Sequence, residues 1–327
     1  GWNAGYVLNM ELIGPDGLTM NADTPKGPPL YNALNASATA GNGVQTLQSY
    51  WFIKSDHWGK VSVGLQSQAS DNAAILVDGS GSLVPANWVA FDYRAFAIRG
   101  SGILVNGGGG PFTGGGVSDL GIWGLSSCGF QGGVAGDCNG LTQNAVRYDT
   151  PTFAGFSASA SWGADDFWDI AIRYAGEHHG FKVAAAAAYN EVDDPKYNNL
   201  GSDSEYFQAG LYLQHIGTGI FALVNYGDYE ATLPVTEDSS TWYVKAGLRR
   251  NWNHLGATVL YGEYENVDDA FGVDGAEFEL WGLGAVQEID AAAMSMWVKY
   301  RHLEADDGQG GDYEDFQLFQ FGALINF

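Results

Sequence analysis

The sequence predicts an all-β fold, a transmembrane barrel of sixteen antiparallel strands, on three observations. Segments of about ten residues alternate apolar with polar side chains, which is the period of a strand with two different faces. The links between them alternate between short turns and longer polar loops, and the number of strands is even. Aromatic side chains gather at the ends of the apolar faces, as a belt at a membrane interface requires.

The alternation is clear in residues 166–176. Trp168, Ile170 and Ile172 share one face of this segment, whereas Asp169 and Arg173 share the other. The same test along the chain predicts strands at residues 2–13, 46–55, 58–68, 87–93, 95–101, 143–149, 153–162, 166–176, 179–190, 204–216, 218–230, 240–252, 255–266, 276–289, 291–303 and 313–327. We expect one domain, residues 1–327, with both ends of the chain on the side of the short turns.

A soluble β-sandwich is the competing fold. Its strands also alternate, but they bury their apolar faces and have no reason to collect aromatic side chains at their ends. The polar faces of this chain carry too many long charged side chains to fill a dry core. A barrel in a membrane accounts for both features, and its closure removes the unpaired edges of the sheet.

The charge of the chain is strongly negative. Lys and Arg number 14 against 38 Asp and Glu, so the formal net charge is −24. This balance excludes a nucleic-acid surface, which needs basic side chains to displace counterions. It favours cations as binding partners. No run of about 18 apolar residues exists from which a membrane-spanning helix could form.

The start of the chain and its cysteines indicate export. The chain begins at Gly1-Trp2 without the basic and apolar regions of a signal peptide, so we expect that a signal peptide has been removed. Cys128 and Cys138 lie ten residues apart in a glycine-rich stretch, which suits a small disulfide loop in an oxidising compartment. Two unrelated free thiols remain the alternative.

Three segments carry a resemblance to a known family. Residues 144–162, NAVRYDTPTFAGFSASASW, resemble the unit of sixth strand, turn and seventh strand in Gram-negative general porins. Residues 166–176, DFWDIAIRYAG, are similar to the alphaproteobacterial branch of that family. The chain ends in the alternating run FQFGALINF, residues 319–327, which resembles the family's closing strand with its terminal aromatic residue. The resemblance covers nearly the whole chain and is weakest over residues 1–45 and 102–142.

The resemblance implies an assembly, a location and a loop arrangement. It implies a homotrimer in the bacterial outer membrane, in contact with lipid and lipopolysaccharide. Phe327 is then the signal that the barrel-assembly machinery reads. The third external loop, residues 102–142, is expected to fold into the lumen and narrow it, and loop 69–86 to reach a neighbouring subunit. Loop 102–142 carries only two acids, Asp119 and Asp137.

The parity of the strands places most basic side chains on the wall of the lumen. The predicted wall cations are Lys54, Lys60, Arg99, Arg147, Arg173, Lys182, Lys245, Arg249, Lys299 and Arg301. Facing the carboxylates of Asp119 and Asp137, they predict a transverse field at a constriction. Arg147 is the strongest candidate because it lies in the family motif, followed by Lys54, Lys60 and Arg99. The alternative is that these cations only satisfy solvation and pair with nearby acids.

The acidic loops raise the possibility of bound calcium, which takes several oxygen ligands. The candidate ligands form two groups, Asp268, Asp269 and Asp274, and Asp306, Asp307 and Asp312. Neither group has the spacing of an EF-hand, so diffuse binding of ions by solvated loops is the alternative. No other cofactor is expected, and no catalytic motif is present: Ser126 and Ser127 lack the Gly-x-Ser-x-Gly turn.

The sequence therefore predicts a channel for passive diffusion of small hydrophilic solutes and ions. We expect weak cation selectivity, because the net charge is large and the acids of the mouth set the local ion concentration. One alternative is a solute-selective channel in which Trp123, Phe130 and Trp281 form an aromatic track. The other is a non-conducting surface protein that uses the barrel as an anchor for adhesive loops.

Overall fold

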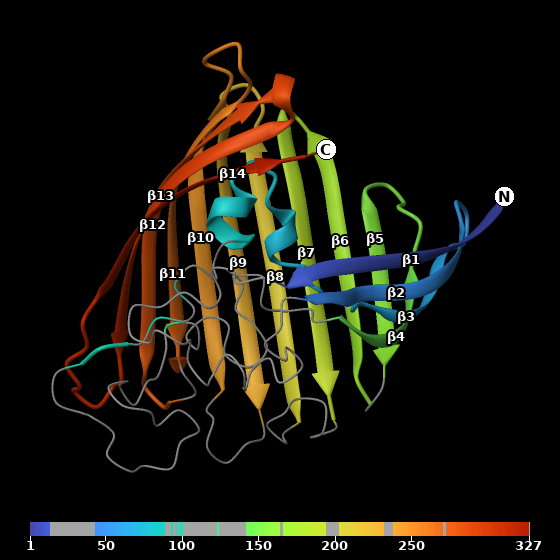
Figure 1. Cartoon of the computed structure of the whole chain (residues 1–327), viewed down its shortest axis with the longest axis horizontal. Coiled ribbons are helices and arrows are strands. Elements are labelled where there is room, and N and C mark those ends of the chain that lie inside the picture. The colour runs from blue at the N-terminus through green and yellow to red at the C-terminus, as the bar shows by residue number, and fades with distance from the viewer. Residues whose placement is uncertain are drawn as a thin grey trace.

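A computed structural model gives the fold, and it describes residues 1–13, 43–88, 93, 96, 98–100, 123, 142–163, 166–193, 203–231, 238–270 and 273–326. These residues form one antiparallel sheet of 14 strands that follow one another in chain order. Figure 1 shows the sheet curved into a wall with short helices on its inner side. Among the described residues, no helix has the length and apolar character needed to cross a membrane.

The strands cover most of the described chain. They are β1 Trp2–Ile13, β2 Gly43–Ser55, β3 Gly59–Ser67, β4 Thr142–Asp149, β5 Phe156–Gly163, β6 Trp168–His178, β7 Phe181–Val192, β8 Ser204–His215, β9 Ile220–Ala231, β10 Ser239–Arg250, β11 Thr258–Asp268, β12 Glu277–Ile289, β13 Met294–Asp306 and β14 Phe316–Ile325. The short helices are η2 Ile75–Val77, η3 Val84–Trp88 and η6 Asp290–Ala292. Each observed strand begins within a few residues of a predicted one.

The two faces of the wall differ as the alternation predicts. On β6, Ile170 and Ile172 are exposed on the outer face, whereas Asp169 is buried on the inner face. Aromatic side chains meet across strands on the outer face, as Tyr226 and Trp242 do with ring centroids 4.7 Å apart. An apolar outer face with aromatic contacts is the arrangement of a wall that faces lipid.

The predicted count of sixteen strands is wrong for the described residues, because the ranges 87–93 and 95–101 supply no strand. The first of these ranges begins inside η3. Of the described residues in the second, only Gly100 makes a β-bridge, to Tyr313. Tyr93 and Ile98 are instead buried in an apolar cluster with Phe278. Their apolar side chains pack against inward residues of β11, β12 and β13, so apolar character in these ranges reflects packing and not a strand.

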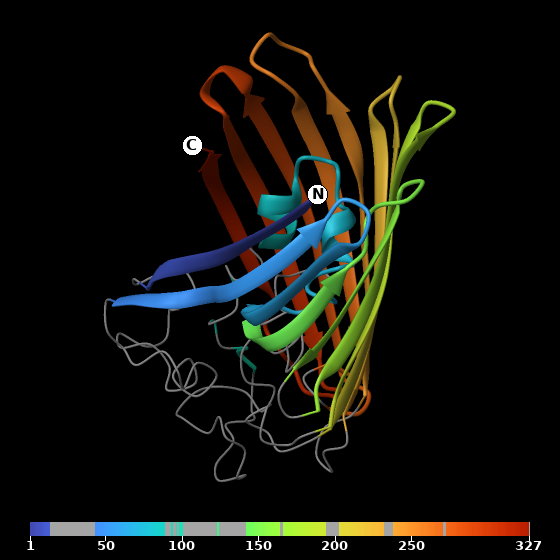
Figure 2. The same ribbon diagram turned by 90° about the vertical axis from the view of Figure 1, so that its right-hand side faces the viewer.

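The predicted closure of the barrel is also absent from the described residues. β1 and β14 are the two edges of the sheet, and no pairing joins them. Figures 1 and 2 show β1–β4 running obliquely to β5–β12. A sheet closes into a barrel only when its strands share one tilt, so the change of direction keeps the edges apart.

Residues 68–88, which we call the inserted segment, follow β3 and lie on the inner side of the wall. η2 packs on β7 and β8, and η3 packs on β13, as both views show (Figures 1 and 2). Ala73, Ala74 and Ala86 of the segment are fully buried. The expectation that loop 69–86 reaches a neighbouring subunit is therefore wrong. Small side chains let this segment fit closely against the wall, and a polar composition alone did not distinguish an inner from an outer position.

The inner wall provides room for the inserted segment at Gly210 of β8. A Cβ atom at this position would lie 2.3 Å from the carbonyl oxygen of Ala74. The backbone of the segment thus approaches β8 more closely than any side chain at residue 210 would allow.

The β6–β7 hairpin shows how a short turn fixes the register of two strands. His178 pairs with Phe181, so the loop consists of His179 and Gly180. Both residues have positive φ, +50° and +85°, as a type I′ turn requires. The predicted turn at residues 177–178 lies two residues too early.

Replacing Gly180 tests this turn. A Cβ atom there would meet no neighbour within 4 Å, so Gly180→Ala should lower the free energy of unfolding through backbone strain alone, by about 1 kcal/mol. Urea titration of the protein folded into lipid vesicles measures the change. Gly262→Ala on β11 is the control, because its Cβ would make an ordinary contact at 3.4 Å. An equal loss in both variants would contradict the assignment of strain to the turn.

Candidate functional site

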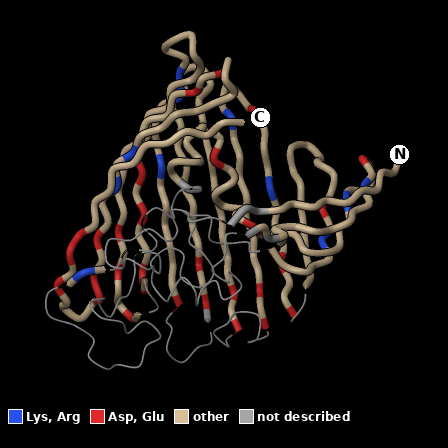
Figure 3. The backbone as a smooth tube through the Cα atoms, in the orientation of Figure 1, with Lys and Arg blue, Asp and Glu red and all other residues tan. Residues whose placement is uncertain are grey.

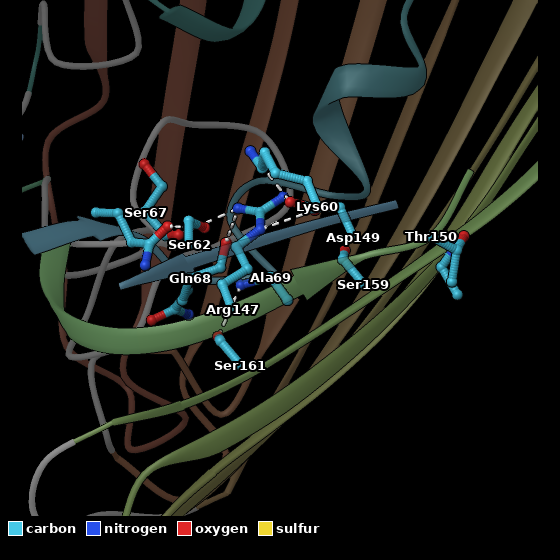
Figure 4. Close-up of polar contacts among 12 residues, drawn as sticks. Lys60, Ser62, Ser67, Gln68, Ala69, Arg147, Asp149, Thr150, Ser159 and Ser161 are labelled. Atoms are coloured by element: carbon cyan, nitrogen blue, oxygen red, sulfur yellow. Dashed lines mark hydrogen bonds and ion pairs between the residues drawn. The ribbon is translucent and has the colours of Figure 1, made fainter. Parts of the chain in front are cut away.

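The inner face of the wall and the inserted segment together form the candidate site, and Arg147 of β4 lies at one end of their contact. Its Nη1 donates to the carbonyls of Ser67, at 3.1 Å, and Gln68, at 2.9 Å. Its Nε and Nη2 donate to Oδ1 of Asp149 at 2.9 and 2.8 Å, and Lys60 Nζ lies 3.2 Å from Oδ2 of the same carboxylate. Figure 4 shows this group at the point where the chain leaves β3. Arg147 therefore fixes the start of the inserted segment.

The next contacts come from β6 and β8. Arg173 donates from Nη2 to the carbonyl of Ala69 at 2.6 Å. Gln208 of β8 donates to the carbonyl of Ser70 at 2.9 Å and accepts the N–H of Ala74 at 2.8 Å. These side chains provide the hydrogen bonds that the backbone of the segment lacks outside a sheet or a long helix.

A buried ion pair holds the middle of the segment. Lys245 of β10 donates to Asp78 of the segment, and both side chains are fully buried. Arg249 of the same strand donates to the carbonyl of Ser80 at 3.1 Å. Its two terminal nitrogens also bind both oxygens of Glu288, at 2.5 and 2.7 Å. Removing one partner of a fully buried pair leaves an uncompensated charge, which costs about 3–5 kcal/mol.

β13 holds the far end of the segment. Lys299 donates to the carbonyl of Pro85 at 2.7 Å, and Arg301 donates to the carbonyl of Ala86. Arg301 also binds both oxygens of Glu263, at 2.7 and 3.1 Å. Cations of β4, β6, β10 and β13 thus bind the segment in the order of its residues, from Gln68 to Ala86. Most inward-facing Lys and Arg side chains of the wall therefore bind this segment.

Most predicted wall cations lie along this contact, but not all do. Six of them bind the chain at or within the segment: Arg147, Arg173, Lys245, Arg249, Lys299 and Arg301. Lys60 shares the carboxylate of Asp149 with Arg147, and Lys54 lies on β2 directly across from Lys60. Lys182 is exposed beside Glu177 at the end of the β6–β7 hairpin. Arg99 lies near the start of β14, where its carbonyl accepts the N–H of Glu314 at 2.7 Å. A role of these residues in lining a pore stays a prediction.

Other predicted residues lie outside the described part of the chain. These are Asp119, Asp137, Cys128, Cys138 and Phe327. The sequence analysis also did not single out Asp78 of the segment, which binds the wall, or Gln208 of the wall, which binds the segment. Their only signal is position, since Gln208 has the inward parity of β8 and Asp78 directly follows the apolar residues 75–77.

Trp123 is the one described residue of the expected constriction loop that lies outside a strand. It is buried on the inner side, with its ring 6.1 Å from those of Phe278 and Phe316. Trp281 is instead exposed on the outer face of β12, where its ring lies 5.4 Å from that of Tyr300. An aromatic track that joins Trp123 to Trp281 is therefore wrong, because the sheet separates them.

Some of the proposed calcium ligands accept hydrogen bonds from nearby backbone N–H groups. Asp269 accepts the N–H of Gly275 and Asp306 that of Gly308, both at 2.7 Å. Among the described residues, a different group, His302, Glu304 and Asp315, brings its ligand atoms within 4.8 Å of one another. Metal binding by Asp268, Asp269 and Asp274, or by Asp306, Asp307 and Asp312, stays a prediction.

Acidic residues gather at the strand ends from which the long links leave (Figure 3). On the outer face, Glu191, Glu205 and Glu230 lie directly across from one another on β7, β8 and β9. The hydroxyl of Tyr189 donates to Glu205 at 2.5 Å. We call Glu191, Glu205 and Glu230 the acidic rim. The three carboxylates, which form no ion pair with a Lys or Arg in the described part of the chain, give this end a negative potential.

The comparisons with known proteins agree with this architecture. The family model described as Gram-negative porin matches residues 1–323, whereas no curated protein matches the chain. An anion-selective porin from Comamonas acidovorans has 16% identity and a TM-score of 0.52, over 99% of this chain and 83% of that one. The trimer form of OmpT, an outer membrane protein of Vibrio cholerae, has 15% identity and a TM-score of 0.47, over 86% and 80%.

The Lys245–Asp78 pair provides a test of the anchoring. Lys245→Met leaves Asp78 buried without a partner, so the inserted segment should become accessible to protease, with an unfolding free energy lower by about 3–5 kcal/mol. Limited proteolysis with mass spectrometry locates the cleavage. The double variant Asp78→Leu/Lys245→Met should recover most of the protection, and Lys182→Met is the exposed control. Equal protection in the wild type and Lys245→Met would show that the pair does not hold the segment.

Asp307 in the β13–β14 loop provides a test by pH. Burial raises the pKa of its carboxyl, but N–H groups of Gln309 and Gly311 and the hydroxyl of Tyr313 outweigh burial, so the pKa lies below its ordinary value. Its contribution to stability should be complete above about pH 3.9 and be lost as the pH falls through the lowered value. Thermal unfolding of Asp307→Asn and the wild type should therefore converge at low pH, whereas the exposed control Asp274→Asn should follow the wild type throughout.

Proposed function

The chain belongs to the Gram-negative porin family, and on this basis we propose that it forms a water-filled channel for passive diffusion of small hydrophilic solutes and ions, with a weak preference for cations. The family places the protein in the bacterial outer membrane. The outer face of the sheet suits that location, because large apolar side chains such as Ile170 and Leu283 are exposed on it.

The observation that carries the proposal is the anchored inserted segment. A wall with apolar side chains outside and polar side chains inside encloses a polar space. The segment is bound along one arc of the inner wall, from Arg147 on β4 to Arg301 on β13. A rigidly held segment of this kind narrows the space without unsatisfied backbone groups, as a diffusion channel with a defined width requires.

The preference for cations follows from which charged side chains are ion-paired and which are exposed. Lys245 and Arg301 are buried in ion pairs with Asp78 and Glu263, so their charge is balanced locally. The carboxylates of Glu205 and Glu230 in the acidic rim are exposed. A solute approaching the mouth therefore meets an excess of negative charge, which raises the local concentration of cations. The selectivity printed for the Comamonas porin is the opposite, and at 16% identity the likeness carries the fold alone.

We extend the proposal to assembly as a homotrimer in contact with outer-membrane lipid and lipopolysaccharide. Phe319 and Phe321 of β14 are among the most exposed apolar side chains of the wall. Their alternation with inward residues supports recognition of the C-terminal strand by the barrel-assembly machinery. No catalytic step is part of the proposed function.

Conductance in a planar bilayer under a KCl gradient tests the function. We expect closure in three steps and a reversal potential on the cation side. An anion-side potential would overturn the selectivity and leave the channel intact. No conductance from correctly folded protein would overturn the channel and favour a surface protein that uses the wall as an anchor.

The acidic rim should set the sign of the selectivity. The triple variant Glu191→Gln/Glu205→Gln/Glu230→Gln removes three negative charges, so its reversal potential should move toward the anion side. Glu177→Gln removes one exposed carboxylate at the opposite end of the wall and serves as the control. The shift should shrink at high salt, where the Debye length is about 3 Å. An unchanged reversal potential in the triple variant would show that the rim does not determine selectivity.

A further inference from the structure

His302 of β13 and two acidic side chains converge on the outer face of the wall, at its long-link end. Nε2 of His302 lies 2.9 Å from Oε1 of Glu304 and 3.4 Å from Oδ2 of Asp315. The ligand atoms of the three side chains all lie within 4.8 Å of one another. Three groups that can coordinate a metal ion thus surround one small volume.

The pairing of β13 with β14 brings these residues together. His302 pairs with Gln317 in the antiparallel ladder. Glu304 lies two residues further along β13, and Asp315 lies two residues before Gln317. Continuing the same register therefore places Asp315 opposite Glu304, on the face that His302 shares. The positions of the three ligands are set by strand pairing.

The imidazole ring of His302 is held by an aromatic neighbour. Trp281 lies directly across from it on β12, and the two rings stack with centroids 5.5 Å apart and an interplanar angle of 30°. Trp281 is itself in contact with Tyr300, at 5.4 Å between centroids. The side chain of His302 is 12% exposed, whereas those of Glu304 and Asp315 are about half exposed. The ring is thus fixed in orientation, and the two carboxylates remain open to an ion from solution.

A hydrogen bond alone does not account for this arrangement. In either protonation state, Nε2 of an imidazole carries at most one hydrogen, which can point well at only one of the two carboxylate oxygens. The two carboxylates also repel each other at this separation. A cation among the three groups attracts both carboxylates and accepts the lone pair of the neutral imidazole. A divalent ion balances the two negative charges.

We infer that His302, Glu304 and Asp315 form a binding site for a divalent transition-metal ion, with zinc as the probe. Imidazole nitrogen and carboxylate oxygen are both ligands of zinc, and three protein ligands leave a fourth position for water. With bonds of about 2.0–2.2 Å, tetrahedral ligand atoms lie about 3.4 Å apart. The distances of 2.9 and 3.4 Å from Nε2 are close to this separation. Calcium fits less well, because it takes oxygen ligands.

This inference goes beyond the proposed channel and does not rest on it. A metal ion at this site joins the end of β13 to the residue before β14, so it holds together the two ends of the link at residues 307–315. The site shares no residue with the two predicted calcium groups. It lies on the outer face, away from the inserted segment.

Zinc binding by the full-length protein in detergent, stripped of metals with EDTA, tests the site. Competition with a chromogenic zinc chelator gives the Kd. We expect His302→Ala to abolish the tightest binding step. Glu304→Gln and Asp315→Asn should each raise the Kd at least about tenfold, because even partners outside the ligand shell contribute that much. His254→Ala removes an exposed histidine from the link between β10 and β11 and is the control, which should bind zinc as the wild type does.

Cobalt provides a second readout that does not depend on stability. Cobalt bound in place of zinc should give the visible absorption of a low-coordinate ion, and His302→Ala should lose this absorption while His254→Ala keeps it. A purely structural role of His302 would not produce such a spectrum.

Three results would overturn the site. Unchanged zinc affinity in His302→Ala would mean that the ion binds elsewhere. Displacement of zinc by an equal concentration of calcium would mean that carboxylates bind cations diffusely, without the imidazole. No zinc binding by the wild type would mean that His302 only pairs with the two acids. Because binding is measured in detergent without a gradient, a failure of this site and a failure of conductance in bilayers are separate outcomes.

Discussion

The structure depends on hydrogen bonds and ion pairs between cations of the wall and the inserted segment. A chain segment inside a curved sheet has carbonyls that no ladder satisfies, and a buried carbonyl without a donor is costly. Here, five basic side chains of the wall donate to carbonyls of residues 67–86: Arg147, Arg173, Arg249, Lys299 and Arg301. Asp78 of the segment also neutralises the charge of Lys245 in a buried ion pair. The interior of the wall thus accepts both a peptide segment and a row of basic side chains, neither of which would be stable there alone.

The distribution of the remaining charge follows from this arrangement. Basic side chains bind on the inner side, whereas the three carboxylates of the acidic rim form no ion pair with a Lys or Arg among the described residues, and Tyr189 donates to one of them, Glu205. Two acids of the inner wall have basic partners, since Asp78 and Glu263 bind Lys245 and Arg301. The two oxygens of Glu265 accept no hydrogen bond among the described residues.

The sequence predicted the faces of the wall better than its connections. Alternation in β6 and β14 is a local property with period two, so Ile170 and Phe319 were assigned to the correct face. The segment after β3 has no such period. Its position depends on partners such as Lys245 and Arg301, which are far away in sequence, and its alanines are compatible with an inner or an outer location. Tyr93 and Ile98 lie in two ranges that were predicted as strands, but they are buried in one cluster with Phe278, and such packing also selects apolar side chains. The motif around Arg147 identified the residue, and Asp149 shares its face two residues further along β4. The contacts of Arg147 with the carbonyls of Ser67 and Gln68 depend instead on the path of the chain after β3.

The contacts of the inserted segment also constrain the order of folding. Gln68 and Arg147 are 79 residues apart in sequence, whereas Ala86 and Arg301 are 215 residues apart. The first contact forms once β4 is present, but the last needs β13, near the end of the chain. Contacts of such long range carry a large loop-closure cost and form late. Complete docking of the segment therefore requires strands from both ends of the chain to be in place at once.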